Sequence, residues 1–143
     1  MSDNLLSFTV SNTNPLIPLA FETWLDNQLI FSGNVSKPQK IEYKFPDDEK
    51  ECQLKFVLKD KKLSYTQIDD QGEIIQDVCV VIADLSLNDI TIQDLLPTCA
   101  EYHHDFNNTR QSTVETFFDT MGCNGTVKLT FTTPVYMWLL EHM

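Results

Sequence analysis

The sequence predicts an all-β protein, an antiparallel β-sandwich that ends in a short C-terminal helix or plug. Short stretches alternate apolar and polar residues, which is the period of a strand with one buried face. Pairs of turn-forming residues separate these stretches, and eight or more such strands indicate an antiparallel sandwich or barrel. The chain has 143 residues and no repeat, linker or low-complexity tract, so we expect residues 1–143 to form a single domain.

The first half of the chain predicts four stretches of β structure. We expect a strand over Leu5–Val10, a hairpin over Leu19–Gly33 that turns at Asp26-Asn27, and strands over Gln39–Phe45 and Glu51–Lys59. Alternation assigns these residues to the inward faces: Leu6, Phe8, Val10, Ile41, Tyr43, Phe45, Cys52, Leu54, Phe56 and Leu58. The lysines between them face outward, either as a solvated surface or as a docking surface for an acidic neighbour such as another copy.

The middle of the chain predicts shorter strands. Two are expected within Leu63–Ile75, around a turn at residues 69–72. The run Val78–Leu87 is apolar at nearly every position, which predicts a central strand covered on both faces. A turn at Asn88-Asp89 leads into a short strand that continues to Leu95. Residues 93–110 have no clear period and predict no element.

The last third predicts a hairpin centred on Asn124-Gly125, a dipeptide that tolerates the positive φ angles of a tight turn. Each arm is expected to bury one face: Val114, Thr116, Phe118 and Thr120 before the turn, then Val127, Leu129, Phe131 and Thr133 after it. Pro134 ends the second arm because proline cannot donate to a strand ladder. Residues 135–143 predict the only helix or plug, which must pack on its own domain or on another chain.

The net charge of −11 is unevenly distributed. Residues 1–62 carry nine acidic and eight basic side chains, whereas residues 63–143 carry twelve acidic and two basic ones. Such a surface repels phosphate groups, so we expect neither nucleic acid nor an anionic membrane as a partner. It suits cations, basic proteins or neutral sugars, and it also simply favours solubility.

The four cysteines, Cys52, Cys79, Cys99 and Cys123, are too far apart for a CxxC motif, and we expect reduced thiols rather than a disulfide framework. The N-terminus has no basic region followed by an apolar run, so no signal peptide is expected. No stretch has the length of a membrane span. These features predict a soluble protein made in a cytoplasm.

Two groups of residues are candidate metal ligands. Asp69, Asp70, Glu73 and Asp77 place four carboxylates within nine positions, so calcium is the one candidate cofactor, although a solvated hairpin turn explains the same residues. His103, His104 and Asp105 are weaker candidates because neighbouring residues on a strand point to opposite faces. The alternative is that both histidines are hydrogen-bonded within a loop.

No catalytic arrangement is apparent. The sequence has no GxSxG motif, no phosphate-binding glycine loop, and cysteines among acidic groups that would raise a thiol pKa. We therefore expect no enzyme activity. Four aromatic residues, Trp24, Tyr65, Tyr102 and Trp138, are candidates for stacking on sugar rings; Trp24 and Tyr65 are the two we favour, although each also suits a core or an interface.

Two resemblances follow from longer segments. Residues 18–92, with FETWLDNQLIF, CQLKFVLKD and QIDDQGEIIQD, resemble the jelly-roll-like β-sandwich of calcium-dependent carbohydrate-binding modules. The segment from Tyr102 onward, with MGCNGTV and FTTPVYMWLLE, resembles the ends of small uncharacterised virion proteins of tailed phages of marine bacteria, including cyanophage-like ones. No functional residue is established in that second group.

The second resemblance implies a non-enzymatic virion structural protein, assembled in the host cytoplasm. We expect a capsid decoration or accessory protein that contacts other virion proteins and is oligomeric in the particle. Its expected interface lies in the apolar C-terminal segment, at Val135, Tyr136, Trp138, Leu139 and Leu140. The alternative is a carbohydrate-binding module, as a tail or fibre accessory that attaches the particle to host glycans.

Overall fold

The computed structural model describes residues 3–14, 17–59, 67–68, 70–71, 74–76, 78–104, 113–122 and 124–142. The first part of the chain forms β1 (Asn4–Asn12), β2 (Leu19–Leu25), β3 (Gln28–Val35), β4 (Gln39–Phe45) and β5 (Glu51–Lys59). The middle forms β6 (Gln67–Ile68), β7 (Ile74–Gln76), β8 (Val80–Leu87), β9 (Ile90–Thr91), the 3₁₀ turn η2 (Gln93–Leu95) and α1 (Leu96–Cys99). The remainder forms β10 (Ala100–His104), β11 (Thr113–Thr116), β12 (Thr120–Met121), β13 (Gly125–Thr132) and α2 (Val135–His142).

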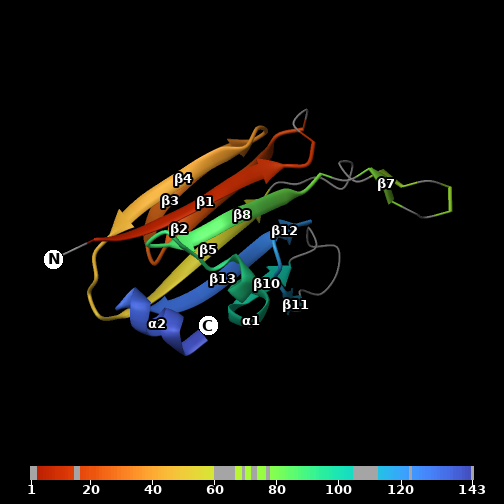
Figure 1. Ribbon diagram of the computed structural model, residues 1–143. Coiled ribbons are helices and arrows are strands. Elements are labelled where there is room, and N and C mark those ends of the chain that lie inside the picture. Colours follow the sequence, from red (N-terminus) through yellow and green to blue (C-terminus); the bar gives the residue numbers. More distant parts are fainter. Residues whose placement is uncertain are drawn as a thin grey trace.

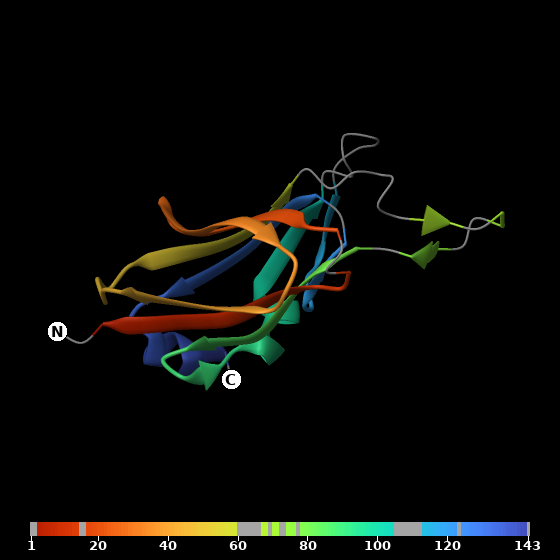
Figure 2. The same ribbon diagram turned by 90° about the horizontal axis from the view of Figure 1, so that it is seen from above.

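These strands form the all-β sandwich that the sequence predicts. One five-stranded sheet has the order β12-β8-β1-β4, with β9 also paired to β8, and a six-stranded sheet has the order β11-β10-β13-β5-β2-β3. Figure 1 and Figure 2 show the two layers, with α2 and the small β6–β7 sheet at opposite ends of the sandwich. All described strand pairs are antiparallel.

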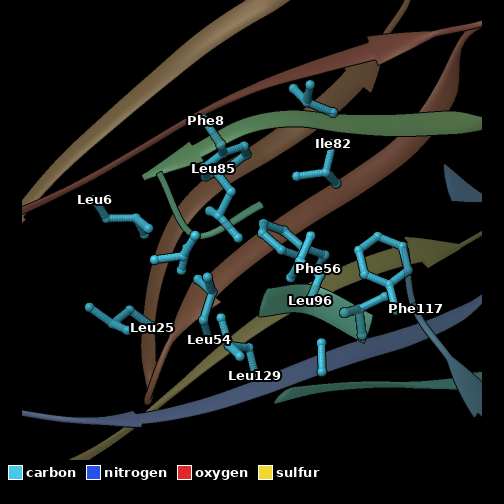
Figure 3. Close-up of a cluster of buried hydrophobic side chains, with 14 of the residues drawn as sticks. Leu6, Phe8, Leu25, Leu54, Phe56, Ile82, Leu85, Leu96, Phe117 and Leu129 are labelled. Carbon is cyan, nitrogen blue, oxygen red and sulfur yellow. The ribbon is translucent and has the colours of Figure 1, made fainter. Parts of the chain in front are cut away.

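The core lies between the sheets, as the strand period requires. Every second residue of β1, β2 and β5 is buried, which confirms the predicted inward faces of β1 and β5. Phe56 is central, because its ring lies 5.1 Å from Phe8 of the facing sheet and 6.1 Å from Phe21 of its own sheet. Figure 3 shows Phe8 and Phe56 in this cluster, together with Leu96 from α1.

The predicted turns at Asp26-Asn27 and at Asn88-Asp89 are confirmed. Asp26 has a φ of 53° in the turn that joins β2 to β3, a conformation that Asp tolerates. Asn88 and Asp89 have φ angles of 54° and 64° between β8 and β9. The Asn88 side chain also accepts a 2.7 Å hydrogen bond from the backbone N–H of Leu5 on the adjacent β1, so this turn is held against β1.

The predicted C-terminal hairpin is wrong. β13 pairs with β10 and β5, whereas β11 pairs with β10 and β12 pairs with β8. Gly125 begins β13 rather than turning a hairpin, and it pairs with His104 of β10. Glycine is required there because a Cβ atom would collide with the backbone carbonyl oxygen of His103. The inward face of β13 is as predicted, with Val127, Leu129 and Phe131 buried.

The predicted inward face of the preceding segment is also wrong. Phe117 and Met121 are buried, while Val114 and Phe118 are 56% and 63% exposed. The two segments β11 and β12 belong to different sheets, so one strand period cannot run through both. The adjacent pair Phe117-Phe118 hides the change, because either residue could be the one that faces the core.

Two further predictions need correction. β8 is central in its sheet but is fully buried on one face only, since Val81, Ala83 and Ser86 of the other face are partly exposed. Asp84 is exposed at an irregularity in the pairing of β8 with β1. Helical structure is not confined to the C-terminus, because η2 and α1 lie between β9 and β10. Pro97 is at the start of α1, where its missing N–H costs no hydrogen bond.

Candidate functional site

The C-terminal helix α2 is fixed to the sandwich at its start. The Thr133–Pro134 peptide bond is cis, and Thr133 is buried. The backbone N–H of Thr133 donates to the carbonyl oxygen of Lys50 at 2.9 Å, and the N–H of Lys50 donates to Thr133 Oγ1 at 2.9 Å. This reciprocal pair ties the end of β13 to the loop before β5, so α2 begins at a defined place.

One face of α2 packs into its own domain. Val135, Trp138 and Leu139 are 1%, 4% and 3% exposed. The Trp138 ring meets the Phe131 ring edge-on at 6.1 Å and stacks on the His142 ring at 4.6 Å. His142 Nδ1 lies 2.8 Å from the Trp138 carbonyl oxygen, which can only accept, so Nδ1 donates. Three of the five predicted interface residues therefore belong to the core of this chain.

The opposite face of α2 is exposed and apolar. Tyr136, Met137 and Leu140 are 56%, 56% and 76% exposed, and we call these three residues the α2 outer face. Leu140 follows Tyr136 by four positions and Met137 by three, the spacings at which side chains on a helix are neighbours. Tyr136 and Leu140 were predicted interface residues, whereas Met137 was missed, although its apolar side chain beside Tyr136 was the available signal.

A cleft of about 340 Å³ opens at one end of the sandwich. It lies between the β2–β3 turn and the loop that follows β4. Its lining includes Leu25, Asp26, Asn27, Gln28, Tyr43, Phe45, Pro46, Asp48, Lys50 and Cys52. This site was missed in the sequence, although antiparallel pairing of β2 with β5 places the end of one strand beside the start of the other.

Two of the charged residues in this cleft, Asp26 and Lys50, pair with each other. Asp26 Oδ1 accepts a 2.9 Å hydrogen bond from the N–H of Gln53, and Asp26 Oδ2 lies 3.3 Å from Lys50 Nζ. The hydrogen bond to Asp26 raises the pKa of Lys50. Burial is the main cause that raises the pKa of the Cys52 thiol, with a further contribution from Asp26. A protonated thiol is a poor nucleophile, and a charged, paired lysine is a poor base.

The outer face of the six-stranded sheet carries a shallow hollow of about 470 Å³. It is lined by Trp24, Asp26, Asn27, Lys55, Val57, Thr126 and Lys128. Trp24, predicted to stack on sugars, is half-buried there, and its Nε1 donates to Glu22 at 3.3 Å. Trp24, Lys55 and Lys128 occupy one row across β2, β5 and β13. Within the described part of the chain, neither lysine of this row lies in an ion pair.

The predicted histidine pair lies on strand β10 rather than in a loop. His104 is buried and stacks on the Tyr102 ring at 3.8 Å, with its Nε2 3.1 Å from a Glu115 carboxylate oxygen. His103 faces the other way, with its Nε2 3.4 Å from a Glu101 carboxylate oxygen. The two imidazoles are therefore not brought together. The third candidate, Asp105, lies outside the described residues.

Three of the four candidate calcium ligands, Asp69, Glu73 and Asp77, lie outside the described residues. The candidate sugar-stacking residue Tyr65 also lies outside them. Asp70 is described and is exposed in a turn between β6 and β7. In the described ranges, no three His, Cys, Asp or Glu side chains form a group that could hold a metal ion. Nor does any described helix have the length and apolar character to cross a membrane.

The cysteines of the described part are Cys52, Cys79 and Cys99, and none of these three is in a disulfide. Burial raises the pKa of Cys99, as it does for Cys52. The predicted direction of the thiol pKa is therefore confirmed at these two residues, but burial rather than acidic neighbours is the main cause. Comparison with known protein families, curated proteins and solved structures found no match for this chain.

Proposed function

We propose that this chain is a non-enzymatic structural protein of a phage virion, a capsid decoration or accessory protein that docks on another virion protein through the α2 outer face. The observation that carries the proposal is the division of α2 into two apolar faces. One face anchors the helix in the sandwich, and the other, Tyr136, Met137 and Leu140, is more than half exposed. A helix fixed in this way presents its exposed side chains to a groove without a large cost of ordering.

The chemistry of the cleft supports a non-catalytic role. Its lysine, Lys50, is paired with Asp26, and its thiol, Cys52, is buried with a raised pKa. Contiguous exposed apolar surface is unfavourable in water, so its retention on α2 favours burial against a partner. The three side chains follow the spacing of a helix that lies in an apolar groove.

The test uses particles of the phage that encodes the chain, prepared from a mutant that lacks its gene. Wild-type protein added to these particles should bind, and Leu140→Lys should weaken binding by at least about ten-fold, because it buries a charge in the contact. Thr130→Lys is the matched control, since it adds the same charge at an exposed position of β13. The proposal fails if mass spectrometry finds no such protein in wild-type particles, or if Leu140→Lys binds like the wild type.

A second candidate is a glycan-binding module, favoured by the half-buried Trp24 in the hollow on the six-stranded sheet. An indole ring beside amide and hydroxyl side chains suits the apolar face and the hydroxyl groups of a sugar. Binding to a glycan array that is lost in Trp24→Ala but retained in Tyr136→Ala would support it. The absence of binding by the wild-type protein would leave only the structural role.

A further inference from the structure

The strand β3 is an open edge of the six-stranded sheet. β2 pairs with it on one side, and the sheet ends there. β3 is eight residues long, QLIFSGNV, with no charged residue and no proline. Leu29 is 40% exposed, and Ser32, Gly33 and Asn34 are also exposed. An edge of this length and composition has backbone N–H and C=O groups available to pair with another strand.

The other described edges differ from β3. β4, which ends the other sheet, has the exposed residues Lys40, Glu42 and Lys44 along its length. β11, at the far edge of the six-stranded sheet, has four residues and includes the exposed Glu115. β12 has two residues. Charged side chains, proline, short length and β-bulges are among the means by which natural sheets prevent pairing at an edge. β3 has one register shift against β2, at Ile30, but no charge, no proline and no short length. Among the edges that the structure describes, β3 alone is both long and without charge.

We infer that β3 is a homotypic interface, where it pairs antiparallel with β3 of a second copy of this chain. Two identical strands related by a two-fold axis perpendicular to them are antiparallel, so each residue that donates to the partner copy also accepts from it. The six-stranded sheets of the two copies then continue across the axis. Because β3 has no charge, its own copy meets no like-charge repulsion along the strand.

The distribution of charge supports a second copy as the occupant. β3 lies in the half of the chain with nine acidic and eight basic residues, and the half with twelve acidic and two basic residues supplies β10 and β11 at the opposite edge of the sheet. Because β3 and β11 are the two opposite edges of this sheet, two copies that join at β3 keep their β10–β11 edges apart. If two copies met through their acidic β10–β11 edges instead, they would repel each other.

The first experiment measures mass in solution by light scattering and sedimentation velocity. The wild-type protein should have twice the 16.5 kDa mass of one chain. Leu29→Lys should be a monomer with an unchanged circular dichroism spectrum, because it introduces the charge that protected edges carry. Asn27→Lys is the matched control, since it adds the same charge in the neighbouring turn, and it should remain a dimer.

A second experiment tests the two-fold geometry. Ser32 lies near the middle of the open edge, so Ser32→Cys should form a disulfide between two copies under mild oxidation, whereas Glu42→Cys on the β4 edge should not. A monomeric wild type, a dimer that persists in Leu29→Lys, or a mass that grows without limit with concentration would each overturn the inference. A dimer lost in Leu140→Lys but kept in Leu29→Lys would instead assign self-association to the α2 outer face.

Discussion

Truncation of Trp138 to alanine should destabilise the isolated domain, because the side chain belongs to the core of its own chain. Trp138 is 4% exposed and contacts Phe131 and His142. A buried indole removes about 200 Å² of surface from water, which at roughly 25 cal/mol per Å² is worth about 5 kcal/mol. Measured truncations of buried Phe and Trp cost about 3–5 kcal/mol, so we expect a loss in that range. This is a large fraction of the ~5–15 kcal/mol that stabilises a typical domain.

The assay is urea unfolding followed by circular dichroism and Trp fluorescence, with Leu140→Ala as the control. Leu140 is 76% exposed, so its truncation should change the free energy of unfolding by no more than about 0.5 kcal/mol. If Trp138→Ala instead costs less than about 1 kcal/mol with an unchanged denaturant slope, α2 is not docked on its own domain and the cis packing is wrong. In that case, a loss of particle binding in Trp138→Ala would show that Trp138 belongs to an interface. If the variant is destabilised as expected, its loss of binding follows from the folding defect instead.

Three other substitutions test separate features of the fold. Gly125→Ala should destabilise the fold by roughly 1–3 kcal/mol in thermal unfolding, because the added Cβ would collide with the backbone of β10. Gly33→Ala is the control and should be nearly neutral, because its added Cβ would have its nearest neighbour at 3.8 Å. Lys55→Glu should raise stability by about 0.2–1 kcal/mol, since it replaces a like charge directly opposite Lys128, and 1 M salt should remove the gain; no gain at low salt would contradict this pairing. The pKa of Glu22 is lowered by hydrogen bonds, of which the one from Lys59 of β5 contributes most. The ionised Glu22 therefore stabilises the fold at pH values above its ordinary pKa of 4.5, and this contribution is lost as the pH falls through the lowered pKa. The melting temperature of Glu22→Gln should therefore lie furthest below that of the wild type at neutral pH and approach it in acid, and a difference that is constant with pH would exclude this linkage.

The sequence predicts which residues of a strand face the core more reliably than which strands pair. Alternation in Leu6, Phe8 and Val10 is a local property, and the structure confirms it. The partner of a strand depends on the whole set of contacts. Asn124-Gly125 has the composition of a hairpin turn, yet β13 pairs with strands that are distant in sequence because two neighbours then cover its backbone. Here tertiary pairing overrides the local turn preference.

The candidate site was predicted in part, for a similar physical reason. The apolar character of residues 135–143 correctly indicates a segment that must pack, but period alone cannot divide it between a face held by its own domain and a face left exposed. Helical spacing shows which residues are exposed only once one buried residue is known, and the structure identifies Trp138 as buried. Tyr136, Met137 and Leu140 then fall on the opposite side. The cleft around Asp26 and the row of lysines were inaccessible to this reasoning, because both depend on strand pairing.

The two proposed contact surfaces are on different elements, which makes their roles separable. α2 packs against β13, whereas β3 is separated from β13 in the sheet by β5 and β2. If the chain dimerises through β3 and docks through α2, each dimer offers two docking faces, and the second contact forms at a high effective concentration. Leu29→Lys should then retain specific docking but dissociate from particles faster than the wild type, while Leu140→Lys should remain a dimer that fails to dock. Equal dissociation rates for Leu29→Lys and the wild type would mean that β3 pairing does not contribute to attachment, even if the dimer forms in solution.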